Sequence, residues 1–237
     1  MELLRLLEKA VKDRSPIVRE VALRRLEEAE IREGLPLAES LLNDKRALVR
    51  SQAAVCVGTL LEGSGEAHYG LRRLLDDPDW IVRDDAQESL EVIGDKGALP
   101  LIERLLDDVE PVVRSHGATV VAALGGRRSK KLLQAKIAAE ESEHAQAGLL
   151  TGLFMIGEPH LLAPLLEHLK SPDYLVRCAT AHYLERLDLN REERTLARKA
   201  LREAKRKALH RADESTMETV LKGLTARRES RARKTKR

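Results

Sequence analysis

A short acidic motif recurs along the chain at a nearly constant interval, and this recurrence constrains the fold more than any other feature. The motif is an aspartate, four residues of any type, and then Val-Arg, as in the stretch from Asp77 to Gly94 (DPDWIVRDDAQESLEVIG). Its arginine position recurs every 31 to 33 residues, at 19, 50, 83, 114, 146 (a glutamine) and 177. A fixed interval in this range predicts a stack of similar supersecondary units rather than a globule around one closed core.

The composition restricts the core of such a stack and the class of protein. Hydrophobic residues make up 43% of the 237 residues but aromatic residues only 2%, so the core must consist of Leu, Ala, Val and Ile. No stretch approaches about 18 apolar residues, and the amino-terminal segment is charged within its first turn. Cys56 and Cys178 offer no disulfide framework. We therefore expect a cytoplasmic protein with no membrane span.

Each unit is predicted to be a pair of helices, with the motif at the start of the second. Apolar residues recur one position before the motif arginine and three, seven and ten after it, which is a helical period. The first helix of several units carries a proline (Pro36, Pro100, Pro164), which predicts that this helix is short or bent. Asp79 is a predicted N-cap of the second helix. Left-handed C-caps are expected at the glycines that follow second helices, namely Gly94, Gly125 and Gly157.

Paired helices at this interval, with the Asp-x4-Val-Arg motif in the second and a proline in the first, resemble HEAT repeats. The most similar kind is the HEAT-like repeat of the phycobilin-lyase type. The resemblance covers residues 1–188 and implies an all-α, right-handed α-solenoid of about six helix pairs, whose second helices line the concave surface. The motif aspartates and arginines are then expected to be caps and ion pairs between successive units, not catalytic groups. Gln146 interrupts this ladder.

The pattern changes after Leu187, where the chain becomes strongly basic. Residues 1–188 carry 25 Lys and Arg against 32 Asp and Glu, whereas residues 189–237 carry 17 against 7. We predict a basic long helix and a C-terminal capping helix over 189–224, followed by a disordered basic tail over 225–237. The apolar face of the long helix is predicted at every fourth residue, namely Leu196, Ala200, Ala204 and Ala208.

The sequence contains no recognisable catalytic, metal-binding or cofactor-binding motif, so we expect a non-catalytic scaffold or adaptor without cofactor or metal. Its partner is expected to be a protein, bound as a helix or peptide segment on the concave surface of the second helices. An uncharged patch there nominates seven protein-binding residues: Val55, Thr59, Thr119, Ala123, Thr151, Phe154 and Met155. An alternative stays open, in which tight curvature already buries these side chains.

Two other functions remain as alternatives. The basic C-terminal helix and tail could bind nucleic acid through the phosphate groups. The residues nominated for that role are Arg198, Lys199, Arg202, Lys205 and Arg206. The same charges could instead be a solvated surface or contact the acidic body of the chain. The family resemblance also leaves a lyase-like enzyme subunit as a third alternative, against which the scarcity of aromatic residues argues. The sequence does not indicate an oligomeric state.

Overall fold

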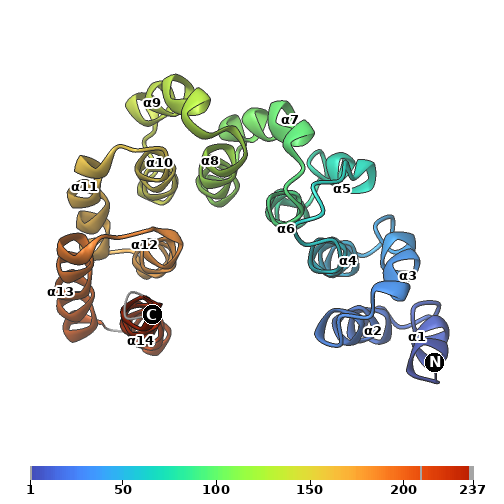
Figure 1. Ribbon diagram of the computed structural model, residues 1–237. Helices are drawn as coiled ribbons and strands as arrows, with labels where there is room; N and C mark the ends of the chain where they lie inside the picture. Colours follow the sequence, from blue (N-terminus) through green and yellow to red (C-terminus); the bar gives the residue numbers. More distant parts are fainter. Residues whose placement is uncertain (1, 209, 235–237) are drawn as a thin grey trace. The chain divides into compact units, whose positions relative to one another are not determined.

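The computed structural model describes residues 2–208 and 210–234, with side chains described as far as residue 225. Within these residues the protein is built of helices and turns and contains no strand, which confirms the all-α prediction (Figure 1). It divides into two compact units, residues 1–125 and 126–237. None of the described helices is both long and apolar enough to cross a membrane.

The first unit consists of four helix pairs. The pairs are α1 (Glu2–Ala10) with α2 (Pro16–Glu28), α3 (Leu35–Ser40) with α4 (Ala47–Leu60), α5 (Tyr69–Leu74) with α6 (Trp80–Ile93), and α7 (Leu99–Arg104) with α8 (Pro111–Gly125). The second helices α2, α4, α6 and α8 pack on one another in succession, and the shorter first helices form a parallel row beside them (Figure 1). This is the predicted stack of two-helix repeats.

The first helices are short because their sequences interrupt regular α-helix at both ends. Pro36 and Pro100 occupy the first turns of α3 and α7, and each of these helices follows a 3₁₀ turn. A second 3₁₀ turn (Leu105–Asp107) follows α7. Proline in the first turn removes a donor that would be unpaired anyway, so it allows a helix to start there and prevents it from extending backwards. The prediction of a short or bent first helix is confirmed.

Both capping residues that the sequence predicts for α6 are found at its ends. Asp79 Oδ1 accepts a hydrogen bond of 3.0 Å from the N–H of Ile81 at the start of α6. Gly94 ends α6 in the left-handed region with φ of 83°, where a side chain would be strained. Gly157 is also left-handed. The C-cap predicted at Gly125 is wrong by one position, because α8 continues through Gly125 and the positive φ belongs to Gly126.

The second unit consists of three helix pairs. These are α9 (Lys130–Ala139) with α10 (Glu143–Met155), α11 (Leu162–Glu167) with α12 (Tyr174–Arg186), and α13 (Arg191–Lys207) with α14 (Arg211–Lys234). The helices α10, α12 and α14 pack in succession, and α13 lies against α14. The last two helices are therefore a seventh repeat, since α14 takes the place of a second helix.

The long basic helix differs from its predicted form. A capping box starts α13, because Asn190 Oδ1 accepts from the N–H of Glu193 while the Glu193 carboxylate accepts from the N–H of Asn190. Its buried stripe is Ala197, Leu201 and Ala204, whereas Leu196 is 55% exposed. The predicted strict four-residue spacing is wrong because helical contacts alternate between three and four residues.

The last helix is longer than expected. It continues ten residues beyond Leu224, into the segment predicted to be a disordered tail. Residues 225–234 contain neither glycine nor proline and are rich in Ala, Arg, Glu and Lys, so helix propensity favours this continuation. Residues 235–237 lie outside the described part of the chain. The division of the chain at residues 188 and 224 remains a prediction.

Candidate functional site

Three motif arginines of the first unit, Arg19, Arg50 and Arg83, each link their own repeat to the next one. Arg50 Nη1 donates to the backbone oxygen of Asp44 in its own motif at 2.8 Å. Its Nε and Nη2 donate to the two carboxylate oxygens of Asp77 in the following motif, both at 2.7 Å. Arg19 with Asp44, and Arg83 with Asp108, repeat this bidentate geometry. The predicted ladder of ion pairs is confirmed in this unit.

The motif aspartate also organises the turn before its helix. Asp108 Oδ1 accepts from the N–H of Glu110 at 2.9 Å, in addition to the Arg83 pair. Although burial acts to raise the pKa of Asp108, the hydrogen bonds from Arg83 and from that N–H outweigh it and lower the pKa below its usual value. The carboxylate is therefore charged and fully engaged at neutral pH, which suits a structural role.

In the second unit, the ladder changes chemistry in two matched positions. Gln146 replaces an arginine, and Ser171 replaces the aspartate of the next motif. Gln146 Nε2 keeps the contact within its own repeat, to the backbone oxygen of Glu140 at 2.6 Å. Ser171 Oγ instead bonds the Glu143 carboxylate. Loss of the cation is thus accompanied by loss of the anion that it would pair with, so neither charge is left buried alone.

The final rung is distorted. Arg177 Nε and Nη2 both donate to Oδ2 of Asp213, at 3.0 and 2.5 Å. Asp213 is fully buried, and its Oδ1 has no hydrogen-bond partner among the described residues. This aspartate follows its arginine by 36 residues, against 25 to 27 in the first unit, because α13 is long and the acid lies inside α14.

The second helices of the first unit present an acidic surface with a less polar strip between its two sides. Four carboxylates stand on α6: Glu88 is exposed, and Asp84, Asp85 and Glu91 are half-buried. Glu20, Glu27 and Glu28 stand on α2, where Arg24 pairs with Glu20 and Arg25 pairs with Glu28, both at 2.7 Å. Between them α4 contributes Val55 and Thr59, both half-buried. We call this set of residues on α2, α4 and α6 the acidic face.

Polar contacts between neighbouring helices hold the acidic face in place. Gln52 Nε2 donates to Glu27 at 2.7 Å, and Ser51 Oγ bonds the Asp85 carboxylate. His116 Nδ1 of α8 lies 3.2 Å from Asp84 Oδ1. These contacts fix the positions of the carboxylates but leave Glu88 exposed to solvent.

Asp85 is expected to make the protein less stable as pH rises. Burial raises the pKa of Asp85 to about 6; the hydrogen bond with Ser51 opposes this, and the nearby Asp84 and Glu88 charges add to it. Because this folded-state pKa is higher than that of the unfolded chain, the stabilisation is present below about pH 4 and is lost as pH rises through about 6. Asp85→Asn should remove the decline, measured as the free energy of unfolding in urea between about pH 4 and 7. An identical pH profile for the two proteins would contradict this.

The structure divides the seven residues predicted for protein binding. Thr119, Thr151 and Phe154 are buried, and each threonine hydroxyl donates to a backbone oxygen of its own helix at 2.8 Å. These three side chains belong to the packing of their units, as the curvature alternative expects. The residues that remain accessible are Ala123, which is exposed, and Val55, Thr59 and Met155, which are half-buried.

The five basic residues nominated for nucleic acid all lie on α13 and differ in exposure. Lys199, Arg202 and Arg206 are exposed and share one face of α13. Arg198 is half-buried, and Lys205 Nζ contacts the Glu218 carboxylate of α14 at 3.2 Å. Nucleic-acid binding by this helix stays a prediction.

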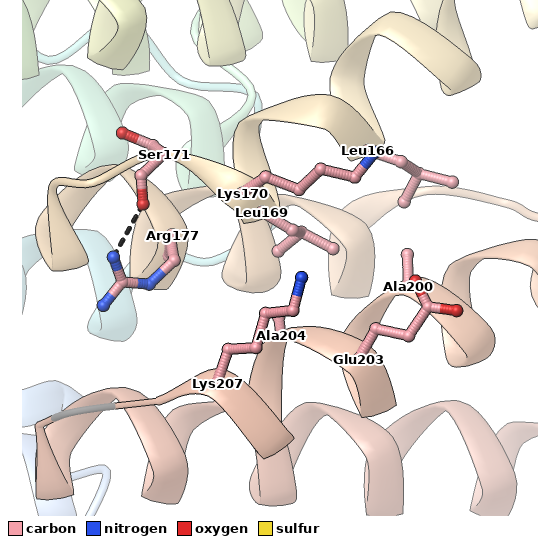
Figure 2. A pocket seen from close by; sticks show the side chains of 9 residues that line it. All are labelled: Leu166, Leu169, Lys170, Ser171, Arg177, Ala200, Glu203, Ala204 and Lys207. Carbon is pink, nitrogen blue, oxygen red and sulfur yellow. Dashed lines mark hydrogen bonds between the residues drawn. The ribbon is translucent and has the colours of Figure 1, made fainter.

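One cavity in the second unit was not predicted from the sequence. It has a volume of about 170 Å³ and lies among α11, the 3₁₀ turn His168–Lys170, α12 and α13. Leu166, Leu169, Ala200 and Ala204 form its apolar lining, and Lys170, Lys207 and Glu203 supply charge. Figure 2 shows the Lys207 ammonium pointing from α13 toward the segment that carries Leu169. Such a lining suits a small molecule with an apolar body and an anionic group.

Metal-ligating side chains do not gather anywhere in residues 2–208 and 210–234: no group of three or more His, Cys, Asp or Glu is placed to hold an ion.

Comparison with known proteins places the chain in a family. A family model of HEAT repeats matches residues 3–91 and 71–149. No curated protein sequence matches. Among solved structures, the complex of CpcE and CpcF of phycocyanin lyase from Nostoc sp. PCC7120 is 19% identical with a TM-score of 0.67, over 93% of this chain and 94% of that chain. Human deoxyhypusine hydroxylase is 17% identical with a TM-score of 0.49, over 95% and 96%. The repeats and their ion-pair ladder, together with the matching family model, establish that the chain belongs to the HEAT-repeat family.

Proposed function

We propose that the protein is an interaction scaffold that binds a helix or peptide segment of another protein on the second helices of its repeats. In the first unit the binding surface is the acidic face of α2, α4 and α6. Val55 and Thr59 would contact apolar side chains of the partner, and the carboxylates on either side would contact its basic residues. The partner is therefore a segment in which apolar residues alternate with Lys and Arg.

The observation that carries this proposal is the cluster of carboxylates on α6. The helix carries Asp84, Asp85, Glu88 and Glu91, and its one Lys or Arg is Arg83, which pairs with Asp108. Burial is the main cause of the raised pKa of Asp85, and the nearby charges of Asp84 and Glu88 add to it. A cationic partner would relieve that repulsion, and charge complementarity of this kind mainly sets specificity and association rate.

The similar solved structure supports a role in assembly. CpcE and CpcF form a complex with each other, so a chain of related fold takes part in a protein–protein assembly there. That likeness extends to the fold alone, and no lyase activity is assigned to the present chain from it. A small-molecule or catalytic role has no comparable support from the residues of the acidic face.

A labelled synthetic amphipathic peptide of leucine and lysine is expected to bind the protein, measured by fluorescence anisotropy. Glu88→Lys should weaken this binding by roughly tenfold, because it replaces an attraction with a repulsion at an exposed position. Raising NaCl from about 0.05 to 0.3 M should weaken binding to the unsubstituted protein far more than to the variant.

Glu66→Lys is the matched control. Glu66 is exposed in the turn between α4 and α5, and its substitution by lysine changes the net charge by the same amount as Glu88→Lys. A second control is the peptide with glutamate in place of lysine, which should not bind. Equal losses for Glu88→Lys and Glu66→Lys would mean that net charge alone draws the peptide, and the acidic face would not be its site. A truncated chain ending at residue 224 tests whether the basic C-terminal segment occupies the face instead.

A further inference from the structure

The cavity of the second unit has an apolar part that the surrounding side chains leave unfilled. Leu166 of α11 and Leu169 of the following 3₁₀ turn line it from one side, and Ala200 and Ala204 of α13 line it from the other (Figure 2). Protein interiors hold few voids larger than a water molecule, so a space of about 170 Å³ between packed helices is uncommon. Since a larger side chain at either alanine would enter this space, the two small residues keep it open.

The volume of the cavity admits the apolar part of one small molecule. A cavity of about 150 Å³ lined by apolar side chains holds benzene. The present cavity is of similar size, so a branched aliphatic chain or a single ring fits inside it.

Two of the charged side chains that line the cavity are already paired within the protein. Arg177 Nε and Nη2 both donate to Oδ2 of Asp213, and its Nη1 donates to the backbone oxygen of Ser171 at 2.7 Å. Lys170 Nζ contacts both carboxylate oxygens of Glu167 at 2.7 Å. The charges of these two cations are therefore balanced without a ligand.

Lys207 and Glu203 remain, and they carry one charge of each sign. Both side chains are exposed, and neither forms a hydrogen bond or ion pair with another described residue. They lie four residues apart, about one turn of α13, and both extend toward the segment that carries Leu166 and Leu169 (Figure 2). The cavity thus presents one ammonium and one carboxylate to solvent, beside an apolar space.

A ligand that matches this lining carries a carboxylate, an ammonium and an apolar body. Its carboxylate would accept from Lys207 and its ammonium would donate to Glu203, and both contacts are charge-assisted. A purely anionic ligand would lie beside Glu203 without a counter-charge, which selects against it. In an α-amino acid with an apolar side chain, the three required groups are attached to one carbon atom.

We propose that this cavity binds a free α-amino acid with an apolar side chain, such as leucine. The side chain occupies the space lined by Leu166, Leu169 and Ala200, and the two charged groups lie at Lys207 and Glu203. The site is built entirely from residues of the second unit and does not use the acidic face.

Isothermal titration calorimetry of the full chain with L-leucine at neutral pH should show saturable binding of one molecule per chain. Isocaproate lacks the ammonium and isoamylamine lacks the carboxylate. Each should bind at least about tenfold more weakly than leucine, because each loses one charge-assisted hydrogen bond. L-Serine keeps both charges but has no apolar body, and it should not bind detectably.

Two substitutions of exposed side chains test the roles of the charges. Lys207→Met should weaken leucine binding about tenfold without weakening isoamylamine binding, and Glu203→Gln should weaken leucine binding about tenfold without weakening isocaproate binding. Lys199→Met is the matched control and should bind leucine normally, since Lys199 is exposed on the same helix but does not line the cavity.

Ala200→Leu tests the location of the site. It should abolish leucine binding by filling the cavity while urea unfolding shows no loss of stability, because Ala200 is half-buried and the added atoms enter unfilled space. If this variant fails to fold, the variants at exposed Lys207 and Glu203 still decide the question. Absence of saturable leucine binding, leucine binding unchanged by Lys207→Met or by Ala200→Leu, or isocaproate binding as tight as that of leucine would each overturn the proposal.

Discussion

Replacing Phe154 by aspartate is expected to unfold the second unit of the protein. Phe154 is only 9% exposed and belongs to the apolar core that includes Leu150, Leu165 and Leu169. Removing the ring costs about 3–5 kcal/mol in similar cores, and an unpaired carboxylate in its place adds the penalty of burying a charge. The sum approaches the whole free energy of unfolding of an ordinary domain, about 5–15 kcal/mol.

Met155→Lys is the matched control for this prediction. Met155 is half-buried against the same core, and a lysine there can keep its methylene chain on the apolar surface while its ammonium reaches water. Its cost should be about 1 kcal/mol. Urea unfolding followed by far-UV circular dichroism measures the free energy of unfolding of both variants. Fluorescence of Trp80, the only tryptophan, reports on the first unit. Equal midpoints for Phe154→Asp and the unsubstituted protein would show that the ring is not a core residue.

The periodic features of the sequence predict the fold well, because each has a local cause. An arginine and an aspartate that recur once per repeat predict one ion pair between successive repeats, and Arg50 forms such a pair with Asp77. Asp79 caps the start of α6 and Gly94 caps its end, as expected, since caps depend on a few neighbouring residues. The interruption of the ladder is also visible in the sequence, where Gln146 stands at the arginine position and Ser171 stands at the aspartate position of the next motif.

The surfaces are less predictable, because they depend on how closely neighbouring helices approach. Thr119 and Phe154 lie five and eight positions after the motif position of their helices, on the side that a single helix would expose. Both are buried in the folded chain. Val18 shows the opposite difference: its position in the repeat predicts a buried side chain, but it is 38% exposed. Periodicity identifies which residues are equivalent, but not which equivalent residue lacks a neighbour.

The cavity beside Arg177 has a similar origin. It depends on a last repeat whose first helix is longer than the others and whose aspartate lies inside α14. The sequence reveals the length of that helix, but the space left between α11 and α13 follows only from their packing.

Arg83→Met should have the largest effect of any substitution outside the apolar core. The Arg83 side chain is 11% exposed and that of Asp108 is 8% exposed, so this bidentate pair is largely shielded from water. The substitution also removes the donor to the backbone oxygen of Asp77 at 2.8 Å. Leaving Asp108 as an unpaired buried carboxylate should cost about 3 kcal/mol, whereas the exposed pair of Arg104 with Asp76 should contribute less than about 1 kcal/mol.

Arg104→Met is therefore the control, and the double variant Arg83→Met, Asp108→Leu tests the cause. If the cost arises from the stranded carboxylate, removing it as well should recover much of the lost free energy of unfolding, as far as the turn tolerates loss of the bond to the Glu110 N–H. Because the Arg83 pair lowers the pKa of Asp108, the difference between Arg83→Met and the unsubstituted protein should be full at pH 7 and shrink as pH falls below about 4. Urea unfolding at both pH values measures this. A loss for Arg83→Met no larger than for Arg104→Met would mean that the ladder sets the geometry of stacking without stabilising it.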